Sequence, residues 1–426
     1  MNVSSRWEYC EIPKCPDDSL VIWTNYDSKS QSSHLLSVQA DPEIVKKETD
    51  TSGIFNVSVV VGSRETQTEF WAIASDYLRR KIFFTDYRSE YVGVRFLNSN
   101  ITVKYFKGMA HGIESMAFDW KTRNLYWTDS EFKWIMATDS SFRYYSPVYR
   151  SGKREPPYGL AIHSKLRKMY FSTYKAFGSK IMVSDLAGKN ATTLFQFPLV
   201  FDVTGLTIDY TNDRLYWTDF TGYGAMVMSS KLDGTNKTQI YYRQGSIFWG
   251  VAAYLDYLYV TDVHARYSHS ADKYYAVWVV VKRTKQAFRY TLVGKPRGIA
   301  VMSNNEERSF DEVSRYGECT ESPQCDHICL PRINATRECA CSLGYHKVGD
   351  VGCSSVIARD EAVFISDSGQ GKIFQIELNV MESEQPSNYN IVPTGHRNSI
   401  ASVSVDMNSR QLYWSEKRTK KIKRAL

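Results

Sequence analysis

Long apolar runs are missing from this sequence. Nowhere in its 426 residues does a stretch reach the roughly 18 to 20 apolar residues that a membrane-spanning helix needs. The first residues, from Met1 to Cys10, also lack the apolar core of a secretory signal peptide. We therefore expect neither a membrane helix nor a leader peptide within this chain.

Broadly distributed positive charge is missing as well. The formal net charge is +7, and one short run near the C-terminal end carries most of it. That run consists of Lys417, Arg418, Lys420, Lys421, Lys423 and Arg424. A nucleic-acid-binding protein needs a broad basic face, so no nucleic-acid partner is expected. We interpret the run as the solvated face of a strand, with Ile422 turned inward; the alternative is a localisation signal.

Cysteine is crowded into one segment. The chain has 8 cysteines, and most of them lie between residues 319 and 353, which indicates a disulfide framework. Sequons of the form N-x-S/T provide candidate N-glycosylation sites at Asn2, Asn56, Asn100, Asn190, Asn236 and Asn334. Both features are typical of extracellular proteins. We interpret the chain as an extracellular fragment of a longer protein, whose signal and anchor lie elsewhere in the parent.

A motif of two aromatics, a hydroxyl residue and an acid recurs along the chain. It is complete, as Tyr-Trp-Thr-Asp, at residues 126–129 and 216–219. Degraded copies lie at residues 22–25, 83–86, 170–173 and 259–262. From the second copy onward these tetrads recur about every 43 to 46 residues, which is the length of one propeller blade.

Each tetrad follows another short apolar run, and a polar turn between the two predicts a hairpin. A third strand is expected around residues 181–183, and a fourth after the turn at residues 232–235. These four strands make an antiparallel blade. Residues 295–301 resemble a first strand without a tetrad, and residues 20–25 contain a tetrad without a first strand. We expect the two to pair, so that six blades close a ring over residues 18–312.

The tetrads resemble the YWTD propeller repeats of the low-density-lipoprotein receptor family. The cysteine spacing C-x5-C-x3-C-x9-C-x-C-x11-C resembles an epidermal-growth-factor-like (EGF-like) module, which we expect at residues 313–355. Spacing alone allows 15 connectivities. The resemblance implies the pairs Cys319–Cys329, Cys325–Cys339 and Cys341–Cys353. No acidic triplet precedes Cys319, so calcium is not expected, and no other metal or cofactor is predicted.

The ends of the chain complete the predicted organisation. The tetrad theme restarts at residues 364–367 and 413–416, so residues 356–426 are expected to form the first two blades of a second, truncated propeller. Residues 1–17 are interpreted as the tail of an upstream EGF-like module. Within them Cys10 and Cys15 are a candidate pair, and their pairing stays open. The predicted fold class is all-β.

An acid beside a hydroxyl in each tetrad invites a catalytic interpretation. A single active site does not need six copies, so we interpret the tetrads as structural. Their aromatics are expected to fill the space between sheets, and their Thr and Asp side chains to bond backbone at the strand end. No catalytic residue is predicted, and the chain is not expected to be an enzyme.

Function is expected where loops share one rim of the ring. In an antiparallel blade the start of the first strand and the end of the second lie on the same side. The strand starts supply Glu114, Tyr158, Thr204, Trp249 and Arg297, and the strand ends supply Tyr87, Arg88, Glu131, Phe220 and His264. Aromatics with Arg and Glu are typical of protein-binding patches. The resemblance implies that this rim grips extended segments of extracellular protein ligands. His264, His269 and His111 add the hypothesis of a pH-dependent release.

The resemblance implies the ligand-binding portion of a low-density-lipoprotein receptor-related protein, endocytic or co-receptor. Such a portion belongs to the ectodomain of a cell-surface, single-pass membrane protein. It acts as a monomeric module and meets the membrane only through parts of the parent receptor that lie outside this chain. One alternative is a nidogen-like adaptor of the extracellular matrix, which carries this propeller beside such modules. Another is a six-bladed hydrolase with a metal on the axis. The strand starts offer a single carboxylate, Glu114, which disfavours the hydrolase.

Overall fold

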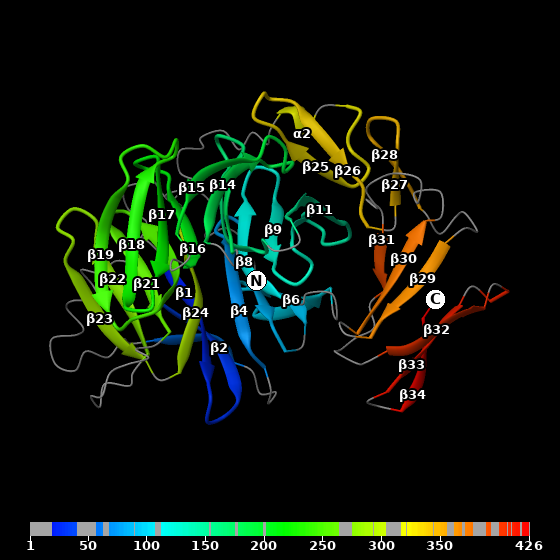
Figure 1. The fold of residues 1–426 in the computed structure, drawn as a ribbon, viewed down its shortest axis with the longest axis horizontal. Coiled ribbons are helices and arrows are strands. Elements are labelled where there is room, and N and C mark those ends of the chain that lie inside the picture. Colours follow the sequence, from blue (N-terminus) through cyan, green and yellow to red (C-terminus); the bar gives the residue numbers. More distant parts are fainter. Residues whose placement is uncertain are drawn as a thin grey trace, which may run out of the picture.

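The computed structural model places a ring of antiparallel sheets beside a small disulfide-bonded module and two further sheets (Figure 1). It describes residues 19–40, 57–62, 68–88, 90–106, 112–152, 155–174, 178–198, 202–263, 275–292, 294–303, 317–320, 322–343, 345–355, 362–368, 371–377, 389–392, 400–406, 408–409, 411–417 and 420–425. The all-β prediction is confirmed: among these residues one short helix, α2 (Gly317–Thr320), accompanies the strands. No helix in the described ranges is long and apolar enough to cross a membrane.

Six four-stranded sheets form the blades of the described ring. Each runs from an inner first strand to an outer fourth strand, and every neighbouring pair is antiparallel. The strands are, for blade 1, β24 (Lys295–Met302), β1 (Leu20–Asp27), β2 (Ser32–Gln39) and β3 (Ser58–Gly62); for blade 2, β4 (Phe70–Asp76), β5 (Lys81–Asp86), β6 (Tyr91–Phe96) and β7 (Ile101–Tyr105); for blade 3, β8 (Ile113–Asp119), β9 (Asn124–Asp129), β10 (Trp134–Thr138) and β11 (Tyr145–Arg150); for blade 4, β12 (Pro157–His163), β13 (Lys168–Thr173), β14 (Lys180–Asp185) and β15 (Thr192–Gln196); for blade 5, β16 (Asp202–Asp209), β17 (Arg214–Phe220), β18 (Gly224–Lys231) and β19 (Thr238–Gln244); and for blade 6, β20 (Phe248–Tyr254), β21 (Tyr257–Asp262), β22 (Tyr275–Val281) and β23 (Ala287–Leu292).

The ring closes as the sequence predicts. The last strand of the propeller, β24, pairs with β1, for example Val301 with Val21 and Ile299 with Trp23. The inner strands of successive blades contact one another, and the circle is complete because β24 contacts both β20 and β4. Pairing strands from the two ends of the domain leaves the ring without an open seam.

The hydroxyl of the tetrad forms hydrogen bonds to the inner strands. In blade 5 the Gly205 N–H donates to Thr218 Oγ1 at 2.9 Å, and Thr218 Oγ1 bonds the Trp249 carbonyl of the next blade at 3.1 Å. The bond within the blade recurs in all six described blades. The bond to the next inner strand recurs in five of them. This confirms the structural interpretation of the tetrad hydroxyl.

A β-bulge in the inner strands brings neighbouring blades close together. In blade 5 the register shifts between Val203 and Leu206. Gly205 lies within this bulge, and a Cβ added there would come 2.6 Å from the Trp249 carbonyl oxygen. Glycine is therefore required, because any side chain would collide with the backbone of the next blade.

Tetrad aromatics fill the space between the sheets, also as predicted. Trp23 from blade 1 is fully buried and packs in one cluster with Tyr259 and Tyr290 from blade 6. Trp217 is fully buried in the cluster between blades 4 and 5, where its ring centroid lies 5.2 Å from that of Phe195. These buried aromatics make each blade depend on its neighbour for its core.

The predicted disulfide pairs are confirmed as Cys319–Cys329, Cys325–Cys339 and Cys341–Cys353. The module also contains β25 (Ile328–Pro331), β26 (Arg337–Ala340), β27 (Tyr345–Val348) and β28 (Gly352–Ser355). It packs on blades 3 and 4: Asn124 Nδ2 donates to the Cys329 carbonyl at 2.8 Å. Ion pairs from Arg167 to Glu318 and from Arg332 to Asp185 hold the same contact.

Residues 362–425 form two three-stranded sheets within the described ranges. Their strands are β29 (Ala362–Asp367), β30 (Lys372–Glu377), β31 (Tyr389–Val392), β32 (Ile400–Asp406), β33 (Gln411–Glu416) and β34 (Lys421–Ala425). Ile373 and Val392 from the first sheet share a buried cluster with Leu412 and Trp414 from the second. Paired tetrad strands with a shared core match the expected start of a second propeller.

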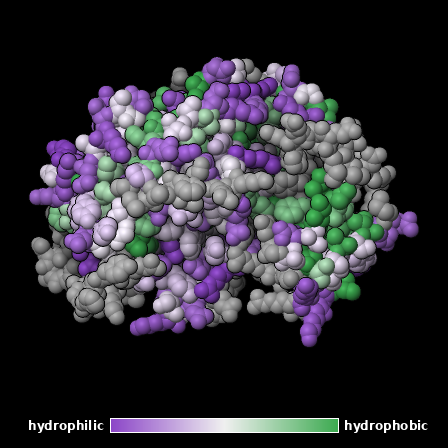
Figure 2. All heavy atoms as spheres, viewed as in Figure 1, coloured by the Kyte–Doolittle hydropathy of each residue, from purple (hydrophilic) through white to green (hydrophobic). Residues whose placement is uncertain are grey.

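The prediction for Ile422 is wrong, because its side chain is 77% exposed. Ile422 pairs with Ser415, whereas the neighbouring Lys423 pairs with Trp414. Trp414 faces the shared core, so the two-residue period of a strand turns Ile422 to the opposite face. Figure 2 shows apolar residues gathered on the side of the molecule where β29–β31 lie.

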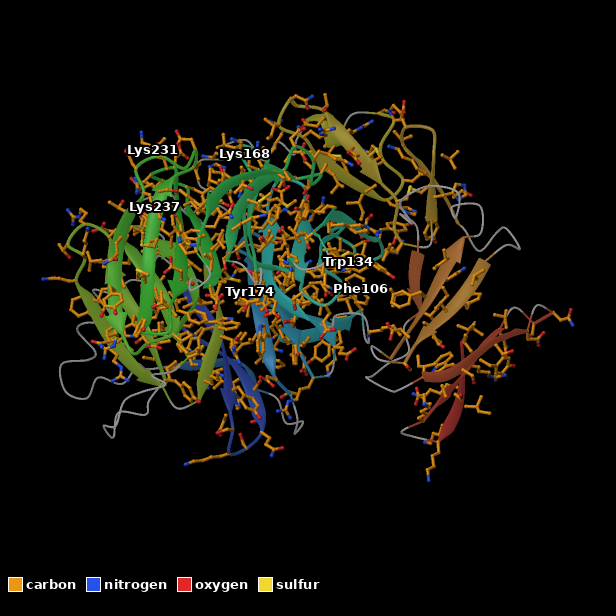
Figure 3. All side chains as sticks on the ribbon, viewed as in Figure 1. Phe106, Trp134, Lys168, Tyr174, Lys231 and Lys237 are labelled. Carbon is orange, nitrogen blue, oxygen red and sulfur yellow. A yellow bond between two sulfur atoms is a disulfide. The ribbon has the colours of Figure 1, made fainter. Side chains whose placement is uncertain are left out.

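The sheet of β29–β31 is anchored to the propeller. Lys372 Nζ lies 2.9 Å from Glu90 Oε2, and both side chains are buried. Nearby, Ile391 packs in a cluster with Trp134 from blade 3 and Leu343 from the EGF-like module. A small cavity of about 20 Å³ lies among these residues. Its lining includes Trp134 and Phe106, which are labelled in Figure 3. Three units of the chain therefore meet at one apolar contact.

The boundaries 18–312, 313–355 and 356–426 stay predictions, because residues at each junction fall outside the described ranges. The same is true of the N-terminal segment 1–17, including Cys10 and Cys15.

Candidate binding rim

One residue at the start of each inner strand lies at the mouth of the ring. Each immediately precedes the residue whose N–H binds the tetrad hydroxyl, so the six positions are equivalent around the axis. All six are partly exposed: Trp71, Glu114, Tyr158, Thr204, Trp249 and Arg297. Five of them are predicted from the sequence, and Trp71 is the position that the prediction missed. The signal was present, because Ala72, Ile73 and Ala74 form an apolar run ahead of the tetrad at residues 83–86.

Arg297 is clamped by the two tryptophans of the neighbouring blades. Its guanidinium carbon lies 3.8 Å from the ring centroid of Trp71 and 4.6 Å from that of Trp249. The two indoles meet edge to face at 5.8 Å. Burial lowers the pKa of Arg297, and the negative charges of Glu69 and Glu114 oppose that shift. An arginine stays protonated at neutral pH, so the clamp holds a desolvated cation.

Glu114 is tied to the same cluster by two hydrogen bonds. Trp71 Nε1 donates to its Oε2 at 3.0 Å, and Ser130 Oγ donates to its Oε1 at 2.9 Å. Burial raises the pKa of Glu114, whereas these hydrogen bonds and the charge of Arg297 lower it. The carboxyl therefore positions Trp71 and lies within the field of Arg297.

The loop after the second tetrad adds a stacked aromatic and a cation. Tyr87 stacks on Trp71 with ring centroids 5.0 Å apart. Arg88 Nε lies 3.2 Å from Glu69 Oε2, and Arg88 Nη2 donates to Tyr26 Oη at 3.2 Å. These contacts join the exits of blades 1 and 2 to the cluster around Arg297.

Tyr158 extends the aromatic surface into blade 4. Its ring centroid lies 6.1 Å from that of Tyr174, whose side chain is 45% exposed and is labelled in Figure 3. Burial raises the pKa of Tyr158, and the charges of Glu114 and Asp202 raise it further. Tyr158 therefore stays protonated and available as a hydrogen-bond donor at neutral pH.

We call this surface the entry rim. It consists of Trp71, Glu114, Tyr158, Trp249 and Arg297 from the strand starts and Tyr87, Arg88 and Tyr174 from the loops after the tetrads. The structure thus gathers into one cluster six of the residues predicted from sequence and adds Trp71 and Tyr174 to them.

Other predicted residues have structural partners. The Thr204 hydroxyl lies 3.1 Å from Thr218 Oγ1 of its own blade and 3.1 Å from the Phe248 carbonyl of the next blade. Its hydrogen bonds are therefore made inside the ring. Phe220 packs against the buried cluster of blades 5 and 6. Glu131 lies over Gly112, where an added Cβ would come 2.7 Å from Glu131 Cγ. His264 falls outside the described residues, as do His111 and His269.

Two of the tetrad carboxyls, those of Asp129 and Asp219, have raised pKa values. Burial raises the pKa of Asp129 to about 8 and that of Asp219 to about 6. Asp129 Oδ1 accepts hydrogen bonds from the N–H groups of Glu131 and Phe132, at 3.0 and 2.9 Å. Asp129 therefore closes a turn at the end of its strand, as predicted for tetrad acids.

The candidate glycosylation sites lie on the other side of the ring. Turns between third and fourth strands are on the rim opposite the entry rim, because the strands of a blade alternate in direction. Three sequon asparagines occupy such turns, each exposed and with positive φ: Asn100, Asn190 and Asn236. Asn334 is exposed in the turn between β25 and β26. Asn2 and Asn56 fall outside the described residues.

One cluster in the described residues has the composition of a metal site. His327, Cys341 and Cys353 lie with their ligand atoms within 4.8 Å of one another. Cys341 and Cys353 form a disulfide, so neither offers a thiolate, and a thiolate is the form of cysteine that binds metals.

Solved structures share the architecture of the ring. A chain in the crystal structure of a nidogen/laminin complex has a TM-score of 0.54 and 16% sequence identity, covering 67% of this chain and 98% of that chain. TolB from Acinetobacter baumannii has a TM-score of 0.52 and 11% identity, covering 67% of this chain and 68% of its own. The chain contains a β-propeller. At these identities the likeness shows the fold of the propeller and nothing further.

Two further comparisons add no argument about function. A gluconolactonase from Xanthomonas campestris has a TM-score of 0.43 and 11% identity, covering 55% of this chain and 82% of its own. No family model matches the sequence.

Proposed function

We propose that this chain is an extracellular ligand-binding portion of a low-density-lipoprotein receptor-related protein, endocytic or co-receptor, and that it binds protein ligands on the entry rim. The observation that carries the proposal is the clamp of Arg297 between Trp71 and Trp249, joined to Glu114 and Tyr87. Tryptophan, tyrosine and arginine are the residue types that dominate binding energy at protein interfaces. Their mutual contacts hold the surface in one conformation, which reduces the entropy lost on binding.

The two rims of the ring differ in what already occupies them. The EGF-like module contacts the opposite rim through Asn124, Arg167 and Asp185. The described propeller sequons project from the same side. A partner that approaches the inner part of the entry rim meets neither the module nor glycans at these sites.

An extracellular setting is supported by the covalent structure of the small module. Three disulfides within residues 319–353 are stable in an oxidising compartment and rare in the cytosol. Exposed sequons in hairpin turns are accessible to glycosylation in the secretory pathway.

A second candidate is an adaptor of the extracellular matrix, and a specific observation favours it. The propeller resembles a chain from a nidogen/laminin complex over 98% of that chain. The sheets at residues 362–425 favour the receptor, because the tetrad theme that restarts there is expected of an array of propellers. Both candidates use the propeller to bind protein.

We propose no enzymatic role. A metal-dependent hydrolase would need several carboxylate or amide ligands on the axis. The six axial positions of the described ring offer one carboxylate, and two hydrogen bonds already orient it on Trp71 and Ser130.

The test is a capture experiment with the secreted full chain. The immobilised chain is exposed to purified serum and basement-membrane proteins at about pH 7.4 and about pH 5.5. We expect a captured protein whose retention falls at least tenfold in the double variant Tyr87→Ala/Trp249→Ala. The control is Tyr242→Ala, which removes an exposed tyrosine on the outer strand β19. Equal retention by both variants contradicts binding on the entry rim.

A further inference from the structure

Arg297 has an unmet hydrogen-bonding capacity. Its Nε is buried and has no hydrogen-bond partner in the part of the chain that the structure describes. Within the same ranges its guanidinium forms no ion pair with a carboxylate. Buried arginines are ordinarily paired, because an unpaired donor in a low-dielectric setting is costly.

The two tryptophans compensate for only part of that cost. Their π-faces stabilise the positive charge, but an indole ring accepts no conventional hydrogen bond from the edge of the guanidinium. A guanidinium offers five N–H donors in a planar fork. Trp71 and Trp249 therefore stabilise the charge of Arg297 while leaving donors of that fork unused.

The nearby carboxylates do not fill this role. Glu69 is held by Arg88 at 3.2 Å, and Glu114 is held by Trp71 and Ser130. Both act on Arg297 through their charges, and neither bonds it. Among the described residues of the cluster, both carboxylates therefore have partners, and the guanidinium of Arg297 has none.

We propose that the clamp of Trp71, Arg297 and Trp249 is a subsite for a carboxylate in an extended ligand segment, an Asp or Glu side chain. The inference rests on the proposed function and names the ligand chemistry of the same rim. A carboxylate matches the guanidinium fork with two parallel hydrogen bonds, which a neutral amide cannot form. The indole faces and Tyr87 then pack against the apolar groups that flank the acid.

A purely structural role for Arg297 predicts a different ligand preference. If the guanidinium only plugs the mouth of the ring, bound ligands show no preference for an acid. The charge-keeping variant Arg297→Lys separates the two roles, because lysine retains the charge and loses the bidentate geometry.

The experiment selects a displayed library of random linear dodecapeptides on the secreted full chain. The selected peptides are synthesised with each acid present and with Asp→Asn or Glu→Gln. We expect one acidic position to be enriched, and its neutralisation to weaken binding to the wild type about tenfold or more. On Arg297→Gln the acidic and neutral peptides should bind equally. Arg297→Lys should give an intermediate loss.

Three outcomes overturn the inference or the function beneath it. Selected peptides without an enriched acid overturn the carboxylate subsite and leave the entry rim intact if Tyr87→Ala still abolishes binding. An acid preference that persists unchanged on Arg297→Gln also overturns the subsite. Peptides that bind Tyr87→Ala/Trp249→Ala as tightly as the wild type overturn the proposed function itself. Should Arg297→Gln lower the melting temperature, the comparison is made with Arg297→Lys.

Discussion

The tetrad hydroxyl offers the sharpest test of how this ring is held together. Thr218 Oγ1 accepts from the Gly205 N–H at 2.9 Å and bonds the Trp249 carbonyl at 3.1 Å, and its side chain is fully buried. Thr218→Val keeps the shape of the side chain and removes both bonds, together with the 3.1 Å contact to the Thr204 hydroxyl. The Gly205 N–H and the Trp249 carbonyl are then left without this partner, at about 1 to 3 kcal/mol each. We expect a destabilisation of about 2 to 6 kcal/mol, which lowers the melting temperature by roughly 5 to 20 °C.

The matched control is Thr218→Ser, which keeps the hydroxyl and loses one methyl group. That loss should cost only about 1 kcal/mol. Differential scanning calorimetry of the full chain measures both variants, with the propeller transition followed separately from that of the small module. If Thr218→Val melts at the same temperature as Thr218→Ser, the hydroxyl does not stabilise the ring and the reasoning is refuted.

Four further predictions follow from the same contacts. Trp217→Ala should destabilise the propeller by about 3 to 5 kcal/mol in chemical denaturation, because its fully buried side chain leaves a cavity between blades 4 and 5. Burial raises the pKa of Asp219 to about 6. The folded protein therefore has its full stability from this group below about pH 4, where the carboxyl is protonated, and loses it as the pH rises through about 6. Asp219→Asn should therefore gain up to about 3 kcal/mol over the wild type between pH 5 and pH 8, and a difference independent of pH contradicts this origin. Lys372→Met removes the ion pair from the buried Glu90 carboxyl, so the sheets at residues 362–425 should melt earlier, and Glu90→Leu in addition should restore them. Replacing Asn100, Asn190 and Asn236 by Gln should lower the mass of the secreted chain by three glycans. Ligand capture should be unchanged.

The sequence predicts the fold well because the spacing of the tetrads can be read directly from it. Tetrads about one blade apart require a ring, and the unpaired strand at residues 295–301 requires the partner that it finds in β1. The three disulfides were available only through resemblance to a known module, since six cysteines alone leave 15 pairings open.

The candidate site was predicted in position and only partly in composition. Strand direction places Glu114, Trp249 and Arg297 on one rim, but their side chains come from separate blades. Which of them touch depends on the twist of each sheet and on rotamers, and a linear pattern carries neither. The clamp around Arg297 was therefore invisible before the structure, as was the use of Thr204 between blades.

Ile422 shows the limit of patterning at a short strand. Alternation predicts that it faces opposite to its neighbours, and the register with β33 decides which face is covered. In the structure the covered face belongs to Trp414, which the sequence alone could not determine.

Binding on the entry rim is tested most directly by a hydroxyl-radical footprint of the secreted chain with and without its captured protein. Mass spectrometry then reports the oxidation of each tryptophan and tyrosine. Binding on the entry rim predicts protection of Trp71, Tyr87 and Trp249, with unchanged oxidation of Tyr242 on the outer strand of blade 5. Protection of Tyr242 with unchanged oxidation of Trp71 and Trp249 would contradict the account, since the ligand would then lie outside the mouth of the ring.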